Sequence, residues 1–117
     1  MPKAESARLL RIHISESDRW EGKPLYEALV ARCREMKIAG ATVFRGLEGF
    51  GESAELHRAH LGRRDRPILI TIFDTAENIA RLLPVIETMM DTGLIAISDV
   101  EVIRVQKQAA SPPAASV

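Results

Sequence analysis

The segment from Pro67 to Asp74 constrains the fold most, because its centre, ILITIF, is apolar on both faces of an extended chain. Isoleucines at positions 68, 70 and 72 alternate with Leu69 and Phe73. A short run of this composition is typical of a strand in the middle of a sheet. Helices that cover one face of such a strand leave large apolar residues on the other. We therefore expect the chain to associate with copies of itself, most simply in a closed ring.

Other periodic segments place this strand in a defined order. Alternating residues predict three more strands, and apolar residues at helical spacing predict two helices with capping residues at their ends. The strands are expected over Ser6–Ile14, Ala41–Arg45 and Ile97–Val105; the first helix follows Pro24 and stops at Gly40, and the second follows Asp74 and Thr75 and ends before Gly93. Pro84 predicts a kink or a restart in the second helix, and Ser15 to Lys23 is expected to be a loop.

The resulting order is strand, helix, strand, strand, helix, strand. This order predicts an α+β, ferredoxin-like βαββαβ domain, with a four-stranded antiparallel sheet and both helices on one face. The first and third strands are central in that topology. With 117 residues the chain is long enough for one such domain, expected over 1–106. Residues 107–117, KQAASPPAASV, are expected to form a disordered tail because they carry no large apolar core residue.

Charge and cysteine content exclude several classes of protein. Sixteen Lys and Arg balance sixteen Asp and Glu, which argues against a nucleic-acid-binding protein. The single cysteine, Cys33, rules out an internal disulfide. No signal-peptide pattern and no apolar run of membrane-spanning length is evident, so we expect a soluble, cytoplasmic protein.

The connection between the second and third strands, Gly46 to Arg66, carries the most distinctive chemistry. It has about twenty residues, although a hairpin needs only two to five. Gly46, Gly49 and Gly51 follow Arg45, and several arginines precede the next strand. Backbone N–H groups freed by glycine, together with arginine, are typical of anion binding. Equally, the glycines can form turns and the arginines can pair with the acidic residues of the same segment.

Other reactive residues give weaker indications. His57 and His60, with Glu55, have a spacing compatible with metal binding, but two histidines fix no geometry and we expect no metal site. No nucleophile elbow or isolated carboxylate pair is present, so we expect no enzyme. A small acylphosphatase-like hydrolase, using Arg19 or Lys23 in the first loop, stays as an alternative.

Several stretches resemble the PII-like proteins of the domain-of-unknown-function family 190. The segments that carry the resemblance are GKPLYEALV at 22–30, AGATVFRG at 39–46 leading into Gly49-Phe50-Gly51, the strand at 67–74, and TGLI at 92–95. The run GATVFRGLEGFG is the most specific of them. The resemblance implies a ferredoxin-like signalling protein related in architecture to the PII nitrogen-regulatory trimers.

For this sequence, the resemblance implies a homotrimer that binds an adenine nucleotide (AMP, ADP, ATP or cyclic AMP) in clefts between subunits. Ligand state would order or release a long mobile segment, here 46–66, that engages a partner, with a membrane transporter or channel as the candidate. The ligand-binding residues that it implies are Arg45, Gly46, Gly49 and Gly51, followed by Lys23, Arg66 and Arg104. A metal- or anion-binding trimer of the copper-tolerance type is the main alternative.

Overall fold

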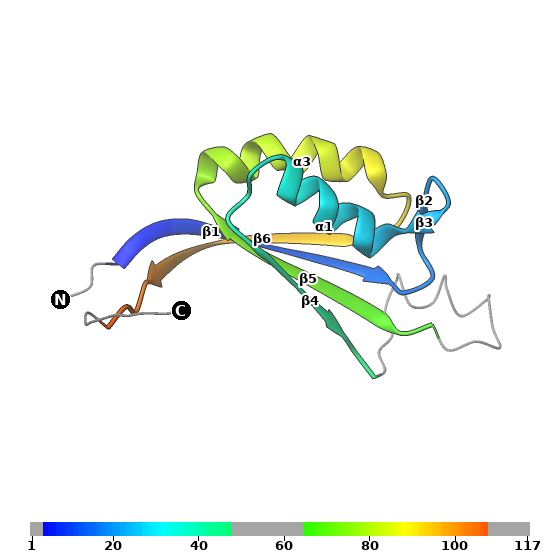
Figure 1. Cartoon of the computed structure of the whole chain (residues 1–117), viewed down its shortest axis with the longest axis horizontal. Helices are drawn as coiled ribbons and strands as arrows, with labels where there is room; N and C mark the ends of the chain where they lie inside the picture. The colour runs from blue at the N-terminus through cyan, green and yellow to red at the C-terminus, as the bar shows by residue number, and fades with distance from the viewer. Residues whose placement is uncertain (1–3, 48–64, 108–117) are drawn as a thin grey trace, which may run out of the picture.

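The structure of the chain is a computed structural model that describes residues 4–47 and 65–107. Its elements in chain order are β1 (Ala4–Ser15), β2 (Arg19–Trp20), β3 (Lys23–Pro24), α1 (Leu25–Glu35), β4 (Ala41–Arg45), β5 (Pro67–Asp74), α3 (Ala76–Met89) and β6 (Leu94–Ile103). The four long strands form one antiparallel sheet in the order β4-β5-β1-β6, and both helices lie on one face of it (Figure 1). The predicted α+β, ferredoxin-like fold is confirmed, with β1 and β5 in the centre.

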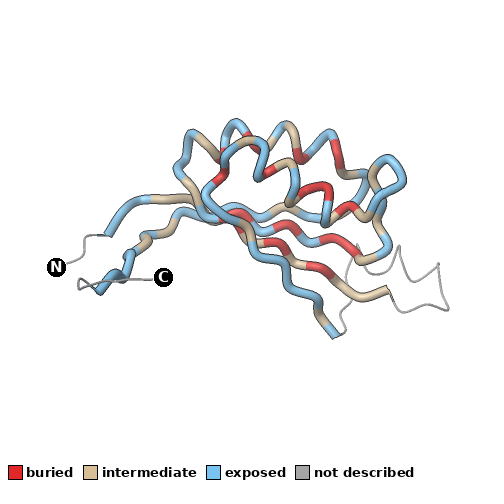
Figure 2. The backbone as a smooth tube through the Cα atoms, in the orientation of Figure 1, coloured by how far each residue is buried: buried red, intermediate tan, exposed pale blue. Residues whose placement is uncertain are grey.

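The hydrophobic core lies between the helices and the sheet (Figure 2). Alternate residues of the two central strands point into it, because side chains of a strand alternate between its faces. Helices α1 and α3 contribute apolar residues from the opposite side. The side chains that are almost completely buried there include Leu10, Ile12, Ile68, Ile70 and Ile72 from the sheet and Leu25, Leu29, Ile79, Leu82 and Ile86 from the helices. Burial of each such side chain contributes about 1.5–3 kcal/mol to folding.

Helix α3 begins with the predicted cap. The side-chain oxygen of Thr75 accepts a hydrogen bond from the N–H of Asn78 at 3.1 Å. The carboxylate of Asp74 accepts hydrogen bonds from the N–H of Thr75 at 2.7 Å and from the N–H of Ala39 at 2.9 Å. The helix then continues through Pro84 to Met89, so the predicted alternative of a restart is wrong. Buried Leu82 and Ile86 anchor it on both sides of the proline.

The structure corrects three local predictions. Strand β6 spans Leu94–Ile103, so it begins and ends earlier in the chain than the expected Ile97–Val105. Helix α1 ends at Glu35, before Gly40, and Lys37 takes the left-handed conformation with φ of 60°. The N–H of Ile38 then donates to the carbonyl of Cys33 at 3.0 Å, and Ile38 becomes buried. The predicted loop at 15–23 contains a small hairpin, β2–β3, whose turn is Glu21-Gly22, with positive φ at both residues.

Strands β1 and β6 extend past the end of β5. Strand β5 stops at Asp74, opposite Arg8, whereas β1 and β6 stay paired as far as Ala4 and Ile103. The residues 4–7 and 100–103 therefore form a two-stranded arm that projects beyond the helices (Figure 1). Among the described strands, none lies in this arm beside the edge of β1 that pairs with β5 elsewhere. A notch results where the arm leaves the sheet.

Candidate functional site

Three of the predicted ligand-binding residues lie together where β4 ends and β5 begins, which we call the loop end of the sheet. A guanidinium nitrogen of Arg45 is 3.0 Å from a carboxylate oxygen of Glu16, in the turn after β1. The N–H of Glu16 donates to the carbonyl of Arg66 at 2.9 Å. Asp65 accepts hydrogen bonds from the N–H and hydroxyl of Ser17 at 3.1 and 2.9 Å. Both ends of the segment 46–66 are thus held against the same turn.

Gly46 has a packing reason to be glycine. Its N–H donates to the carbonyl of Pro67 at 2.8 Å. A Cβ added to Gly46 would lie 2.8 Å from Cγ of Pro67, closer than real Cβ atoms approach other heavy atoms. The strand pair β4–β5 therefore closes tightly at the loop end because residue 46 has no side chain.

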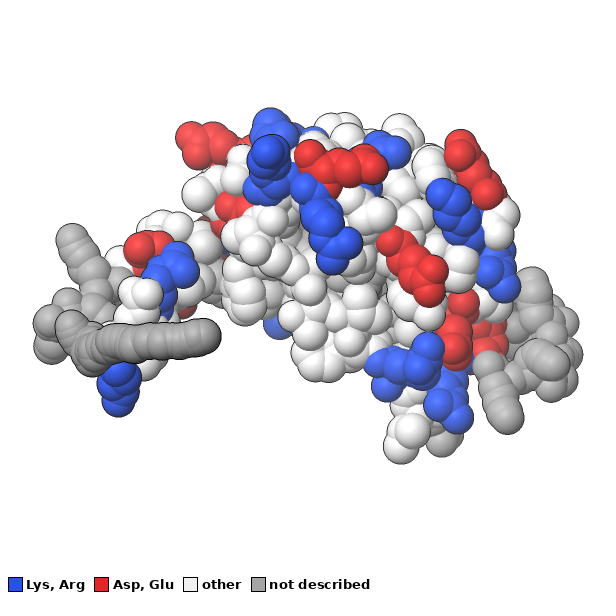
Figure 3. Space-filling view, in the orientation of Figure 1, with Lys and Arg blue, Asp and Glu red and all other residues white. Residues whose placement is uncertain are grey.

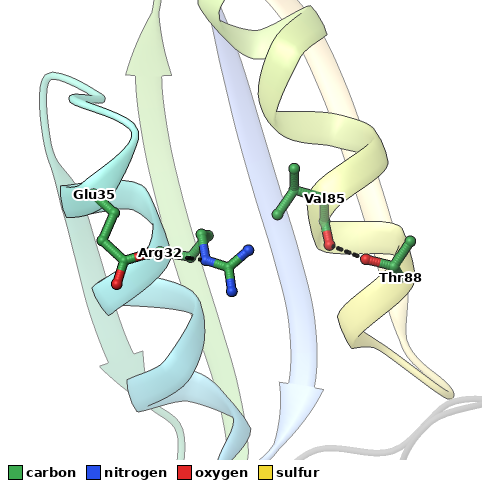
Figure 4. Close-up of polar contacts among 4 residues, drawn as sticks. All are labelled: Arg32, Glu35, Val85 and Thr88. Atoms are coloured by element: carbon green, nitrogen blue, oxygen red, sulfur yellow. Dashed lines mark hydrogen bonds and ion pairs between the residues drawn. The ribbon is translucent and has the colours of Figure 1, made fainter.

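Lys23 lies apart from this group, in the β2–β3 hairpin. Its Nζ is 6.0 Å from the centre of the Trp20 ring, and the guanidinium carbon of Arg32 is 5.8 Å from the same ring. Arg32 also forms an ion pair with Glu35 one turn further along α1, at 3.1 Å (Figure 4). The same figure shows the hydroxyl of Thr88 donating to the carbonyl of Val85 on α3, at 2.8 Å. The outer surface of the helix layer thus forms polar contacts within itself.

Part of the predicted site cannot be placed. Gly49, Gly51, His57 and His60 lie outside the described residues, as do the arginines at positions 58, 63 and 64. Within residues 4–47 and 65–107, three or more metal-ligating side chains do not gather at any point. In that same part of the chain, no helix is long and apolar enough to cross a membrane.

Arg104 lies at the opposite end of the sheet, next to a cavity of about 500 Å³ in the notch beside the arm. The cavity has the size of a small-molecule site. Residues from four separate segments line it: Glu5, Ser6 and Ala7; Ala39, Gly40, Ala41 and Thr42; Thr71, Phe73, Asp74 and Thr75; and Val102 and Arg104. Of the five predicted ligand-binding residues that the structure describes, Arg104 is the one that lines it.

The lining of this cavity combines an aromatic ring, hydroxyl groups and one guanidinium. Phe73 is 50% exposed and presents a ring to the cavity wall. Thr42, Thr71 and Thr75 supply hydroxyl groups. Arg104 is only loosely paired, with 3.8 Å between its guanidinium nitrogen and a carboxylate oxygen of Glu5. Such a set can stack a flat ring, bind hydroxyls and attract an anion.

Asp74 adds a carboxylate whose charge is already compensated. Partial burial acts to raise the pKa of Asp74, but hydrogen bonds from the N–H groups of Ala39 and Thr75 and from the amide of Asn78 outweigh it. The positive charge of Arg81 acts in the same direction, so the net pKa lies below its usual range. Asp74 therefore stays ionised and fixes the geometry of the 39–41 turn against the start of α3.

Sequence reasoning missed the threonines and Phe73 as site residues. Thr42 and Thr71 are opposite each other in the β4–β5 register, but about thirty residues separate them in the chain. The alternation that predicts both strands also implies that these residues share one face. The notch itself, however, depends on β1 and β6 outlasting β5, which alternation does not predict.

A second hollow, of about 560 Å³, lies on the other side of the arm. Its polar residues are Ser6, Arg8, Asp99 and Glu101. The guanidinium of Arg8 is already held by Asp99, with 3.1 Å between the nitrogen and oxygen. Both hollows thus hold two carboxylates and one arginine. Arg8 is held closely by Asp99, whereas the contact between Arg104 and Glu5 is longer, at 3.8 Å, so Arg104 is the more available cation for an anionic ligand.

The chain shares its fold with a PII-like protein of known structure. A solved structure of the apo form of CPII, a nitrogen regulatory PII-like protein from Thiomonas intermedia K12, matches with a TM-score of 0.60 and 18% identity, covering 90% of this chain and 100% of that one. A structure of the same protein bound to ADP and bicarbonate matches with a TM-score of 0.59 and 21% identity, covering 87% and 93%. At these identities the likeness shows the shared fold.

The chain belongs to the DUF190 family, whose model, described as "Uncharacterized ACR, COG1993", matches residues 7–102. A UPF0166 protein of Aquifex aeolicus is 42% identical over 98 residues, which cover 82% of this chain and 92% of the relative. The UPF0166 protein MJ1524 of Methanocaldococcus jannaschii is 35% identical over 99 residues, covering 82% and 91%. The family resemblance inferred from the sequence segments is thereby confirmed.

Proposed function

We propose that this protein is a PII-like regulator that binds an adenine nucleotide between subunits of a homotrimer and does not turn it over. The observation that carries the proposal is the cavity beside the arm, with Phe73, three threonines and Arg104 in its wall. An aromatic ring suits the base, hydroxyl groups suit the ribose, and a guanidinium suits a phosphate. The solved structure of CPII with ADP and bicarbonate supports this ligand class, because it has the same fold.

Self-association follows from the open face, by which we mean the face of the sheet opposite the helices. Phe44, Phe73 and Leu94 are each 50% exposed on it. Figure 3 shows charged side chains of both signs over the helix layer, while the visible surface below the middle of that layer is largely uncharged. Apolar surface of this kind favours association, and three copies around an axis would close a ring.

A subunit interface would also complete the nucleotide site. One protomer offers a single guanidinium in the cavity, together with the carboxylates of Glu5 and Asp74. A nucleotide with several phosphate charges therefore needs cations from elsewhere. Arg45 is the leading candidate, because it ends the edge strand β4 whose first residues line the cavity. In a ring of subunits, the loop end of one copy would supply Arg45 and Arg66, and its β2–β3 hairpin would supply Lys23, to the cavity of the next.

The segment 46–66 is proposed to transmit the ligand state to a partner, with a membrane transporter or channel as the candidate. Its two ends join Arg45 and Arg66, so a ligand at these arginines acts directly on its attachment points. Arg45 is paired with Glu16 in the free chain. A phosphate group that replaces Glu16 as the partner of Arg45 would change how the segment is held.

Calorimetric titration of the full chain with AMP, ADP, ATP and cyclic AMP tests the proposal. We expect one of these to bind with micromolar affinity, about 8 kcal/mol, without release of phosphate. Arg104→Ala and Arg45→Ala should each weaken binding roughly tenfold or more, as expected for a lost charged contact. Arg34→Ala, which removes an exposed arginine from α1, is the matched control and should bind like the unmodified chain.

Three outcomes would contradict parts of this proposal. Failure of all four nucleotides to bind would overturn the ligand class. Loss of binding in Arg104→Ala with full binding in Arg45→Ala would confine the site to one protomer. Phosphate release that depends on Arg19 or Lys23 would favour the hydrolase alternative.

A further inference from the structure

The centre of the open face carries two polar residues, Arg11 and His13, on the middle strand β1. Leu10, Ile12 and Ile14 on the same strand are buried under the helices, whereas Arg11 and His13 are exposed. Strand geometry therefore points both side chains away from the helices, with their Cα atoms about 6.8 Å apart. Neither residue contributes to the cavity beside the arm.

The surroundings of this pair are uncharged. In the sheet register His13 lies between Leu69 and Leu94, and Arg11 lies between Thr71 and Ala96. Phe44, opposite Leu69, extends the row of His13 to the edge strand β4. The residues that the described parts of β4, β5 and β6 add elsewhere on this face are also uncharged: Thr42, Phe73, Ser98, Val100 and Val102.

The nearest carboxylate on this face of β1 is distant. Glu5 lies six residues before Arg11, about 20 Å along the strand, and it is paired with Arg104. Asp74 and Asp99 flank Arg8 in the register and therefore share the other face, with the helices. Within the described strands, then, Arg11 has no carboxylate in reach on the face to which it points.

Self-association through this face would bury the side chain of Arg11 in the subunit interface. This step rests on the proposed function, which joins copies of the chain through the open face. Burial removes water from the guanidinium, which stays charged at any ordinary pH. A symmetric assembly brings further copies of the same positive group toward each other instead of a carboxylate. An unpaired buried charge is strongly destabilising, so a counter-ion is needed.

We propose that Arg11 and His13 from neighbouring copies form a binding site for a small inorganic oxyanion, such as phosphate or sulfate, within the subunit interface. A guanidinium offers two parallel N–H donors that match two oxygens of such an ion. The imidazole of His13 adds a further N–H donor. The apolar side chains in the row of His13, from Phe44, Leu69 and Leu94, exclude water and strengthen these contacts. Binding of the oxyanion then stabilises the assembly.

Sedimentation equilibrium of the full chain tests this site. The self-association constant is measured in chloride, sulfate and phosphate at matched ionic strength. For the unmodified chain we expect association to strengthen roughly tenfold or more in either oxyanion, as for a gained bidentate contact. Arg11→Gln should associate without this dependence, because the variant buries no charge. Arg34→Gln, on the outer surface of α1, should keep the full dependence.

The controls separate the possible failures. Sulfate strengthens apolar burial in general, so an equal response of Arg11→Gln and the unmodified chain would overturn the site. Association that is indifferent to both oxyanions would overturn the site but keep the proposed assembly. A chain that stays monomeric in all three salts would overturn both. Nucleotide binding by Arg11→Gln, measured by calorimetry, reports on the cavity beside the arm independently of either result.

Discussion

The two faces of the sheet are built from the same strands but differ in how far their apolar residues are shielded from water. On the covered face, Ile70 and Ile72 are completely buried under α1 and α3. On the open face of the same strand, Phe73 stays half exposed, as do Phe44 and Leu94 on the edge strands. A single chain thus completes one face and leaves the other with apolar surface. The covered face determines whether the chain folds, and the open face is the one through which we propose that the folded chain associates.

The largest contrast is expected from two truncations of adjacent residues in β5. Ile70→Ala removes a fully buried side chain between the helices and the sheet, and should lower the free energy of unfolding by about 2–5 kcal/mol. Leu69→Ala removes a partly exposed side chain from the open face, and should cost dilute protein about 1 kcal/mol or less. Urea unfolding at low protein concentration measures both values.

The same two variants should rank in the opposite order when self-association is measured: Leu69→Ala should weaken it more than Ile70→Ala. Leu69→Ala removes contact surface from the open face, whereas Ile70→Ala leaves that face intact. Sedimentation of the folded variants measures this effect. Equal losses of folding stability in the two variants, or unchanged association of Leu69→Ala, would contradict the division between the faces.

A second prediction concerns Gly93, the residue directly before β6. Gly93 has φ of 133°, and an added Cβ would lie 2.7 Å from both the carbonyl oxygen of His13 and Cε of Met90. Gly93→Ala should therefore destabilise the fold by about 2–3 kcal/mol, from backbone strain and steric overlap. Gly40→Ala is the matched control, since nothing lies within 4 Å of its Cβ position. It should change stability by about 0.5 kcal/mol or less.

Thermal unfolding of both glycine variants provides the measurement. A loss in Gly40→Ala as large as that in Gly93→Ala would show a general effect of glycine replacement. It would contradict the specific role of the close approach between β6 and β1. Because Gly93 precedes the open-face residue Leu94, the variant should also weaken self-association.

The covered face could be predicted well from the sequence, because it depends on local periodicity. The alternation in β1 and β5, the helical spacing from Leu25 to Cys33, and the cap at Thr75 each lie within a short segment. Each local preference agrees with the global fold, as in other foldable sequences. The apolar residues on both faces of β5 also predict an apolar open face, because both sets of residues lie in the same short strand.

The site was less predictable because it depends on where elements end. Arg45 is predicted from its place before Gly46, and Arg66 is implied by the family resemblance; the structure brings both near the same turn. The cavity beside Arg104 exists because β5 stops at Asp74 while β1 and β6 continue. Likewise, α1 ends where Lys37 takes the left-handed conformation, which local propensity does not favour. The burial of Ile38 that results compensates for this cost.

The smallest predicted effect is the pH dependence of stability that arises from Cys33, the only cysteine in the sequence. Cys33 lies on the covered side, and burial raises the pKa of its thiol to about 11. The folded protein therefore keeps the thiol protonated, while the unfolded chain ionises it from about pH 8.5. Stability is complete below that pH and is lost as the pH rises toward the folded value. At pH 8.5 the loss is only about 0.4 kcal/mol.

Two thiol variants turn this shift into a comparison of the faces. Ser98 is exposed on the open face, opposite Leu9, so Ser98→Cys in a Cys33→Ala background places one thiol there. In dilute protein we expect this thiol to react with a disulfide reagent much faster than Cys33, because the reactive thiolate forms far more readily at an exposed site. Its rate should fall as the protein concentration rises and the open face becomes covered. A Cys33 that reacted as fast as the Ser98→Cys thiol would mean that the helix layer opens often. An open-face thiol that stayed equally reactive at all concentrations would mean that this face stays exposed to solvent, and that the ring of subunits does not form through it.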